Sequence, residues 1–244
     1  MSKTLSKRTE KQIDAAVNLY KNRMDDFRLL AQTLLLNLTE DSKLRTLIHS
    51  TKLRTKDPEH LRDKLVRRAL EAKKKGRILG IDESNVFKIV EDLAGVRLLH
   101  LHTKQMAQIH PTILNVLKEH RYRVIGKPAA NTWDIEHQAF FKNLGMKTNL
   151  RPSMYTSVHY IIMANRRTQM RCELQVRTLM EEVWGEVSHM INYPHETKSV
   201  ICQEQLKVLA RVASGGARLV DAIFLAHQEH AKKRSHCRSV SGRH

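Results

Sequence analysis

The side chains best suited to chemistry lie in the stretch 155–177, which reads YTSVHYIIMANRRTQMRCELQVR. Two runs rich in β-branched and aromatic residues flank the polar turn 165–168, and this pattern predicts a β-hairpin. Alternate residues of a strand share one face. We therefore expect one face to combine an aromatic ring, a hydroxyl, an imidazole, a carboxylate, an amide and guanidinium groups: Tyr155, Ser157, His159, Arg171, Glu173, Gln175 and Arg177.

The second strand of this hairpin alternates cleanly between apolar and polar residues over 170–177. If the apolar rows of both strands point to a core, His159 must pair with Glu173 or Gln175, and the turn must contain an odd number of residues, three or five. An ordinary solvated sheet face is the alternative interpretation. The variety of the polar side chains favours a surface that binds a nucleotide.

A second group of candidate side chains is basic and lies around the start of a helix predicted over 58–74. Pro58 suits the first helical position and Asp57 suits the N-cap. Helix N-termini favour phosphate groups, because their backbone N–H groups are unpaired and the helix dipole is positive there. An ordinary charged helix face is the alternative. We call the side chains that converge on this terminus the basic corner: Arg54, Lys56, His60, Lys64 and Arg67.

A buried strand predicted over 94–102 has Asp92 at its entrance and Arg97 within it. A carboxylate at such a position serves either as a metal ligand or as a cap. Together with Glu173 it could hold Mg²⁺, which takes oxygen ligands from one or two carboxylates and from substrate phosphates. The chain contains neither a GxxxxGK[ST] loop nor a GxGxxG loop. The residues alone indicate phosphoryl or nucleotidyl transfer.

Composition limits the class of protein and of partner. A chain of 244 residues that is 41% hydrophobic and 28% charged is long enough for one domain with helical additions. The formal charge of +18 favours polyanions such as nucleotides or RNA, with a basic solvated surface as the alternative. Three separated cysteines fit a reducing compartment. The first residues show no apolar signal segment and no apolar run could cross a bilayer, so we expect a cytoplasmic protein without membrane contact.

Hydrophobic periodicity predicts the remaining elements. We expect helices over 9–38, 84–93, 103–120, 179–191, 196–213 and 217–230, strands over 44–53 and 122–125, and a disordered tail over 232–244. The helix 179–191 should keep Glu181, Glu182, Glu186 and His189 on its polar side and bury the other face: Leu179, Val183, Val187 and Met190, with Trp184 and Ile191 alongside. Residues 126–153 show no clear period, so we expect a mobile or functional flap over the site.

Four ordered segments resemble the motifs of the RelA/SpoT-type alarmone synthetase domain: RTKDPEHL at 54–61, VEDLAGVR at 90–97, YTSVH at 155–159 and ELQVRT at 173–178. No hydrolase half accompanies them, so the chain resembles the small, single-domain synthetases. The resemblance implies an α+β fold, with a nucleotidyltransferase-like mixed β-sheet flanked by helices. The domains expected are an N-terminal helical extension over 1–43, the synthetase domain over 44–193, C-terminal helices over 194–233 and a basic disordered tail over 234–244.

The resemblance also implies transfer of the β,γ-pyrophosphate of ATP to the 3′-hydroxyl of GTP or GDP, with Mg²⁺ as the cofactor. Asp92 and Glu173 would be catalytic and would bind the metal, and Glu173 would also be the general base. Arg54 and Arg97 would sandwich the adenine, and Tyr155 would stack on the acceptor guanine. The other ATP-binding residues would be Lys56, His60, Lys64 and Arg67, and the other acceptor-binding residues Ser157, His159, Gln175 and Arg177.

Three features depart from the family pattern: Met154 stands where members usually have Gly, His60 stands where many have Ser, and the stretch 126–153 is longer than in compact members. Two alternatives therefore remain. One is pyrophosphorylation of the tRNA 3′ end, as in toxin-like relatives, which the charge of +18 favours. The other is a non-enzymatic RNA-binding or regulatory module, against which the intact Asp92 and Glu173 argue. Small synthetases are often homo-oligomers, so a second copy of the chain is a candidate partner.

Overall fold

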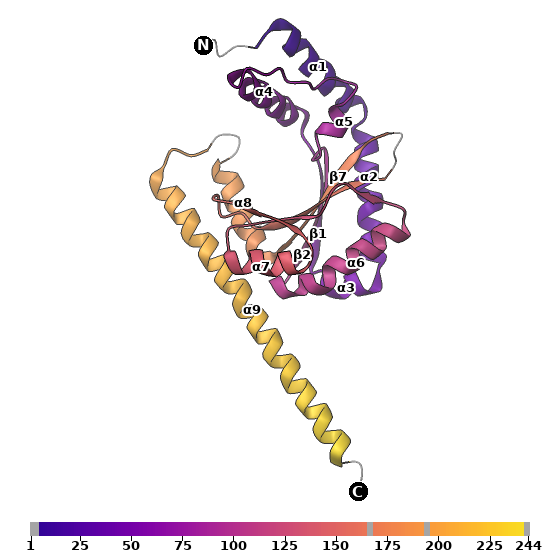
Figure 1. Ribbon diagram of the computed structural model, residues 1–244, viewed down its shortest axis with the longest axis vertical. Helices are drawn as coiled ribbons and strands as arrows, with labels where there is room; N and C mark the ends of the chain where they lie inside the picture. The colour runs from indigo at the N-terminus through magenta and orange to yellow at the C-terminus, as the bar shows by residue number, and fades with distance from the viewer. Residues whose placement is uncertain (1–4, 165–167, 193–195, 242–244) are drawn as a thin grey trace.

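A mixed sheet forms the centre of the molecule and contains the predicted hairpin (Figure 1). The computed structural model describes residues 5–164, 168–192 and 196–241. The strand order is β1-β2-β7-β6-β4-β5, and β3 pairs with β6. The pairs β2–β7 and β4–β5 are parallel, and the other pairs are antiparallel. The strands are β1 (Ser50–Thr55), β2 (Ala94–His100), β3 (Arg123–Val124), β4 (Ala129–Thr132), β5 (Lys147–Leu150), β6 (Ser157–Met163) and β7 (Arg171–Thr178).

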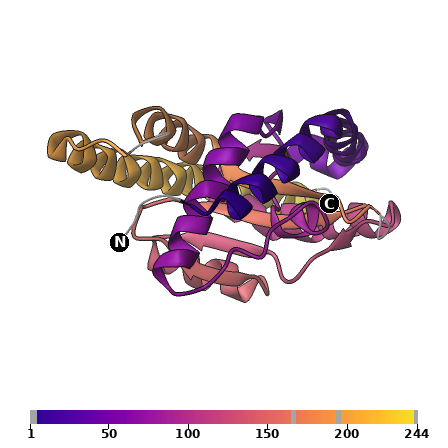
Figure 2. The same cartoon turned by 90° about the horizontal axis from the view of Figure 1, so that it is seen from above.

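Helices cover both faces of this sheet, which confirms the predicted α+β class (Figures 1 and 2). On one face α2 packs against β1, β2 and β7, and α8 packs against β2 and β7 from the other. At one end α1 packs along α4. The helices are α1 (Lys7–Asn22), α2 (Met24–Glu40), α3 (Ser42–Leu47), α4 (Pro58–Lys74), α5 (Val86–Ile89), η1 (Thr103–Gln105), α6 (Met106–Glu119), α7 (Ile135–Asn143), α8 (Leu179–Asn192) and α9 (Val200–Ser241).

The hairpin has the predicted register. His159 pairs with Gln175, so the polar rows of β6 and β7 share one face of the sheet. The connection 164–170 contains an odd number of residues, as expected, but it is longer than three or five. Part of the predicted turn, 165–167, lies outside the described residues.

The N-terminal region differs from the prediction in two places. The helix expected over 9–38 is divided at Arg23, which has a non-helical backbone with φ of −116° and ψ of 11°. The beginning of the strand expected over 44–53 is helical instead, because the side chain of Asp41 accepts a hydrogen bond from Leu44 N and so caps α3. A single buried apolar cluster joins α1, α2, α4 and α6 to the sheet.

The expectation of a flap over 126–153 is wrong, because this stretch forms β4, α7 and β5 and extends the sheet beyond β6. Its elements are short: Asp134 caps a helix of nine residues, and Gly145 with φ of +81° allows the turn into β5. Elements this short do not produce a measurable period in the sequence.

The buried face predicted for the helix 179–191 is wrong for most of its residues. Val183, Val187 and Met190 of α8 are exposed, and Glu182, expected on the polar side, is buried. Trp184 is buried as predicted. This orientation arises because α8 lies over the polar face of the sheet, where cations require carboxylate partners. The two helices predicted over 196–213 and 217–230 form one helix, α9, which continues to Ser241 in the region expected to be a disordered tail. No helix within the described ranges is long and apolar enough to cross a membrane.

Candidate active site

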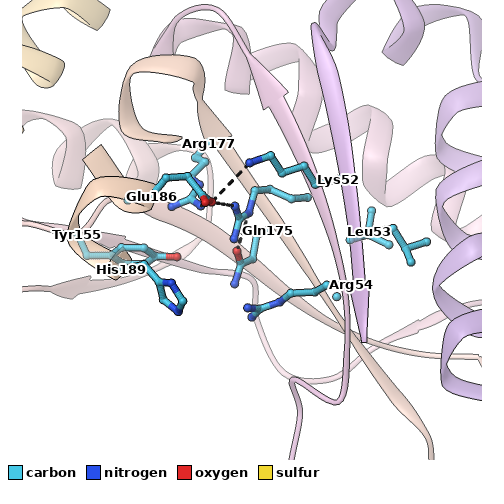
Figure 3. Close-up of a pocket in the computed structure, with 12 residues that line it drawn as sticks. Lys52, Leu53, Arg54, Tyr155, Gln175, Arg177, Glu186 and His189 are labelled. Atoms are coloured by element: carbon cyan, nitrogen blue, oxygen red, sulfur yellow. Dashed lines mark hydrogen bonds and ion pairs between the residues drawn. The ribbon is translucent and has the colours of Figure 1, made fainter. Parts of the chain in front are cut away.

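A pocket of about 400 Å³ opens between the polar face of the sheet and α8 (Figure 3). Its position follows from the sheet register, which aligns Lys52, Arg97 and Gln175 across β1, β2 and β7. Figure 3 shows α8 contributing Glu186 and His189 from the side opposite Lys52 and Arg54. The lining residues are Lys52, Leu53, Arg54, Gly95, Val96, Arg97, Tyr155, Gln175, Arg177, Gly185, Glu186 and His189.

Five of the predicted nucleotide-binding residues line this pocket: Arg54, Arg97, Tyr155, Gln175 and Arg177. The two predicted carboxylates, Asp92 and Glu173, are not among the lining residues. The five that line it come from all four motifs named above. The parallel pairing of β2 with β7 brings them together, and this pairing joins residues far apart in sequence. In the adjacent row Gly95 lies between Arg54 and Glu173, and a Cβ atom at Gly95 would lie 3.3 Å from Arg54 Cγ and Nε. The glycine therefore lets the Arg54 side chain cross the sheet surface.

A continuous chain of hydrogen bonds fixes Glu173. Tyr155 Oη lies 2.9 Å from His159 Nε2, and His159 Nδ1 lies 2.9 Å from Glu173 Oε1. On the other side Gln175 Nε2 donates to Glu173 Oε2 at 2.8 Å, and Arg97 Nε donates to Gln175 Oε1 at 3.2 Å. Both oxygens of Glu173 therefore have a defined direction, as a base that must accept a proton from one position requires.

Glu173 is ionised at neutral pH. Burial alone would raise the pKa of its carboxyl group, but the hydrogen bond and charge of His159, with the hydrogen bond from Gln175, bring the pKa below its ordinary value. A half-buried carboxylate that is ionised and hydrogen-bonded on both oxygens is able to accept a proton from a hydroxyl group placed beside it.

The basic corner surrounds the second carboxylate. Lys56 Nζ and Lys64 Nζ lie 3.1 Å and 2.7 Å from the two oxygens of Asp92. Burial would raise the pKa of Asp92, but the two lysines lower it to about 2. His60, Arg54 and Arg67, the other members of the corner, are exposed. Asp57 caps α4 as predicted, accepting hydrogen bonds from Glu59 N and His60 N.

Tyr20 also supports this corner, and sequence reasoning placed it only on the apolar side of a helix. Its hydroxyl group donates to Lys56 O at 2.6 Å and approaches Leu93 O at 3.1 Å, while its ring is fully buried. One side chain of α1 therefore holds the end of β1 beside the segment that enters β2. No spacing in the sequence connects Tyr20 to residues this distant along the chain.

The two carboxylates fit Mg²⁺ better than a metal enclosed by protein. Among the described residues there is no group of three or more His, Cys, Asp or Glu side chains that could hold a metal ion. Asp92 and Glu173 are close enough for the charge of Asp92 to act on the pKa of Glu173. A pair of carboxylates suits Mg²⁺, which keeps water ligands and takes others from substrate phosphates.

Sequence reasoning missed Glu182 and Glu186 as parts of the site. Glu182 Oε1 lies 2.7 Å from Lys52 Nζ and 2.6 Å from Arg97 Nη1, and its Oε2 lies 2.5 Å from Arg177 Nη2. Glu186 Oε1 lies 2.7 Å from Arg97 Nη1. The available signal was a pair of glutamates four residues apart, one helical turn, immediately after the ELQVRT segment.

Three residues predicted to bind the acceptor are buried: Ser157, Gln175 and Arg177. Ser157 is 1% exposed, and its hydroxyl group points to Val176 O at 3.5 Å. Arg177 is 4% exposed, and it is nevertheless one of the residues that line the pocket. Met154, which stands where the family usually has Gly, has φ of +62°. The backbone before Tyr155 is therefore in the left-handed region, which explains the glycine that is usual at this position.

Comparison with known proteins gives a consistent family. The model described as "Region found in RelA / SpoT proteins" matches residues 53–198. The chain is 26% identical over 151 residues to GTP pyrophosphokinase YwaC of Bacillus subtilis (strain 168), which covers 60% of this chain and 59% of that protein. The match thus spans about three fifths of the length of this curated relative.

Solved structures share the fold. A GTP pyrophosphokinase family protein from Streptococcus pneumoniae has a TM-score of 0.58 at 18% identity, over 93% of this chain and 97% of that one. Small alarmone synthetase 2 from Bacillus subtilis has a TM-score of 0.58 at 20% identity, over 86% and 98%. Small alarmone synthetase 1 from the same organism, bound to its product pppGpp, has a TM-score of 0.54 at 18% identity, over 84% and 92%. Because the family model matches more than half of the chain, the protein belongs to the RelA/SpoT family.

Proposed function

We propose that the protein is a pyrophosphokinase that transfers the β,γ-pyrophosphate of ATP to the 3′-hydroxyl of GTP or GDP. The observation that carries this proposal is Glu173, an ionised carboxylate fixed between the Tyr155–His159 pair and the Asp92–lysine group. Because Glu173 lies between these two groups, the acceptor nucleoside binds on the Tyr155 side of it and the phosphates of ATP bind on the Asp92 side. The similarity to a GTP pyrophosphokinase and to small alarmone synthetases supports the same activity.

On the donor side, Arg54 and Arg97 bind the two faces of the adenine ring. The phosphates of ATP are bound by the remaining members of the basic corner: Lys56, His60, Lys64 and Arg67. The side chains of Lys56 and Lys64 are long enough to move from Asp92 to the phosphates without movement of the backbone. When bound with the nucleotide, Mg²⁺ supplies positive charge next to the transferred group, and Asp92 and Glu173 are the residues that would hold it.

On the acceptor side, Tyr155 stacks on guanine and His159 contacts the acceptor phosphates. Glu173 takes the proton of the 3′-hydroxyl group while the 3′-oxygen of the acceptor forms a bond to the β-phosphorus of ATP. The bond between that phosphorus and the oxygen bridging the α- and β-phosphates breaks, and AMP leaves. The lysines released from Asp92 neutralise charge that develops on the transferred pyrophosphate.

The test uses ATP labelled at the β-phosphate, Mg²⁺, and GTP, GDP or deacylated tRNA as the acceptor. Label on a guanine nucleotide supports the proposal. Label on tRNA alone would replace it with the toxin-like activity, which the charge of +18 favours. Tight RNA binding without any transfer would leave a binding module. If the basic surface binds RNA, affinity should fall steeply with salt, because each neutralised phosphate releases a counterion.

We also propose that two copies of the chain associate through the outer face of α9. Ile201, Val208, Val212, Leu219 and Ile223 are all exposed. Their spacings of seven and four residues place them along one stripe, opposite the buried alanines of the same helix. A helix that is apolar on both sides is usually buried on both sides. A single stripe can contact its own copy around a two-fold axis, which makes a second copy the natural partner.

Light scattering tests this association. Leu219→Asp should reduce the measured mass, whereas Lys207→Asp, an exposed charge reversal on the same helix outside the stripe, should not. A wild-type mass of one chain would contradict the proposal.

A cytoplasmic location forms part of the proposed function, because Cys172 and Cys202 are both free thiols, as expected in a reducing compartment.

A further inference from the structure

We propose that α8 positions the ring of Tyr155 through Arg177, so that Arg177 acts on the acceptor indirectly and Gly185 and Glu182 are positioning residues of the acceptor pocket. This inference rests on the proposed function and names the residues that determine how its acceptor is bound. None of these three residues needs to contact the nucleotide.

The first observation is where the Arg177 guanidinium lies. Arg177 is 4% exposed, and its Nη2 is 2.5 Å from Glu182 Oε2. Its Cζ atom lies 6.0 Å from the centroid of the Tyr155 ring, within the distance at which a cation is attracted to an aromatic face. The guanidinium therefore connects the first turns of α8 with the ring expected to stack on the acceptor.

The second observation is the close approach of Arg177 to the backbone of α8. A Cβ atom at Gly185 would overlap Arg177 Nη1 and would lie 3.2 Å from its Cζ. A glycine within a helix lowers helix stability relative to alanine, so its presence calls for a spatial reason. Room for the guanidinium supplies that reason. The guanidinium is buried and paired with Glu182, so moving it aside would disturb that ion pair and its position over the Tyr155 ring.

The third observation is that Tyr155 depends on contacts with α8 and α9 for its position. It precedes β6, which begins at Ser157, and follows Met154 with its φ of +62°. Its ring lies 6.4 Å from that of Trp184, and Met154 and Tyr155 both pack against the small cluster of Trp184 with alanines of α9. Moving the guanidinium would therefore move the ring, while Arg97 keeps its contacts with Glu186 and Gln175 and the basic corner stays in place.

The decisive experiment compares steady-state kinetics of Gly185→Ala with those of the wild type. The added methyl group displaces the guanidinium, so the KM for GTP or GDP should rise about tenfold or more, the size expected for a lost stacking contact. The KM for ATP should change less than about twofold, a change of under half a kcal/mol on the binding scale. Gly80→Ala is the control, because its Cβ would meet no atom within 4 Å. It should leave both constants unchanged.

A double-mutant cycle separates this mechanism from a general packing defect. Arg177→Lys keeps the positive charge but removes the guanidinium that Gly185→Ala would strike. Gly185→Ala combined with Arg177→Lys should therefore be no worse than Arg177→Lys alone, and the two acceptor effects should not add. Additive effects, or equal increases in the two KM values, would overturn the proposal. If Gly185→Ala does not fold, Arg177→Lys alone must still raise the acceptor KM selectively.

The outcomes also distinguish this inference from the proposed function. A wild-type protein that transfers no pyrophosphate to GTP or GDP contradicts the proposed function. A wild-type protein that does transfer it, with an unchanged acceptor KM in both Gly185→Ala and Arg177→Lys, contradicts only the positioning role. Near-ultraviolet circular dichroism reports the Tyr155–Trp184 environment without any turnover, and it should change in Gly185→Ala but not in Gly80→Ala.

Discussion

The two sides of the pocket are constructed differently. On the donor side Asp92 holds Lys56 and Lys64 through ion pairs, and most of the surrounding basic groups are exposed. On the acceptor side the groups hold one another: Arg177 is buried beneath α8, and Tyr155, His159 and Glu173 form one hydrogen-bonded chain. Flexible lysines can exchange a carboxylate for phosphates, whereas the acceptor side must keep its geometry to present one hydroxyl group to Glu173.

The largest effect should come from Glu173→Gln, which lies between the two sides. The amide cannot accept the proton, so transfer should fall by about 10²- to 10⁴-fold, the usual contribution of a general base. ATP binding should persist, because the basic corner is unchanged. Measuring turnover together with equilibrium binding of ATP checks both statements. Transfer that survives this substitution would show that another group is the base.

A smaller and selective effect is expected for Tyr155→Ala. Loss of one stacking contact should weaken binding of the guanine nucleotide by about 10- to 100-fold, because stacking on an aromatic ring contributes roughly 1–3 kcal/mol. Binding of ATP should not change. Arg67→Ala is the matched change in the basic corner and should show the opposite selectivity. Equal losses of both nucleotides in either variant would mean that the two sides are not independent.

The pH dependence of stability tests the ion pairs of the donor side. The two lysines hold the pKa of Asp92 at about 2, below its ordinary value of 3.8. A lowered pKa gives stability that is fully present above about pH 4 and is lost as the pH falls toward 2. The free energy of unfolding should therefore fall by about 1–2 kcal/mol over this range through Asp92. For Asp92→Asn, the free energy of unfolding measured with urea should depend less on pH between 4 and 2. A pH dependence equal to that of the wild type would contradict the assignment.

The smallest effect is expected for Tyr20→Phe. It removes a hydroxyl group that bridges Lys56 O and Leu93 O, so it should lower the free energy of unfolding by about 1 kcal/mol. Because it supports only the donor side, the KM for ATP should rise while that for the acceptor should not. Thermal unfolding and steady-state kinetics measure the two effects. A rise in the KM for the acceptor alone would mean that Tyr20 supports the acceptor side and not the donor side.

The sheet face could be predicted because strand alternation is local. The period of two in 170–177 placed Glu173 and Gln175 on one face and limited the partner of His159 to one of these two residues, of which the structure has Gln175. The capping residues around Pro58 predicted α4 for the same reason. In each case neighbours in sequence carry the physical signal.

The rest required contacts between distant residues. The rule that apolar side chains of a helix face inward gave the wrong face of α8, because three cations on the sheet favour carboxylates on the inner side. Short elements hid β4, α7 and β5 from any period. The hydroxyl group of Tyr20 and the glycine at 185 acquire their roles only from atoms that the fold brings next to them.

The length of α9 gives the molecule an unusual shape in solution. A helix of 42 residues extends about 63 Å at a rise of about 1.5 Å per residue, and much of it projects past the sheet (Figure 1). Such a rod attached to a rounded body increases friction far more than it increases mass. A monomer should therefore sediment slowly for its size and elute early from a gel-filtration column, so that elution volume alone would overstate the number of copies in a particle.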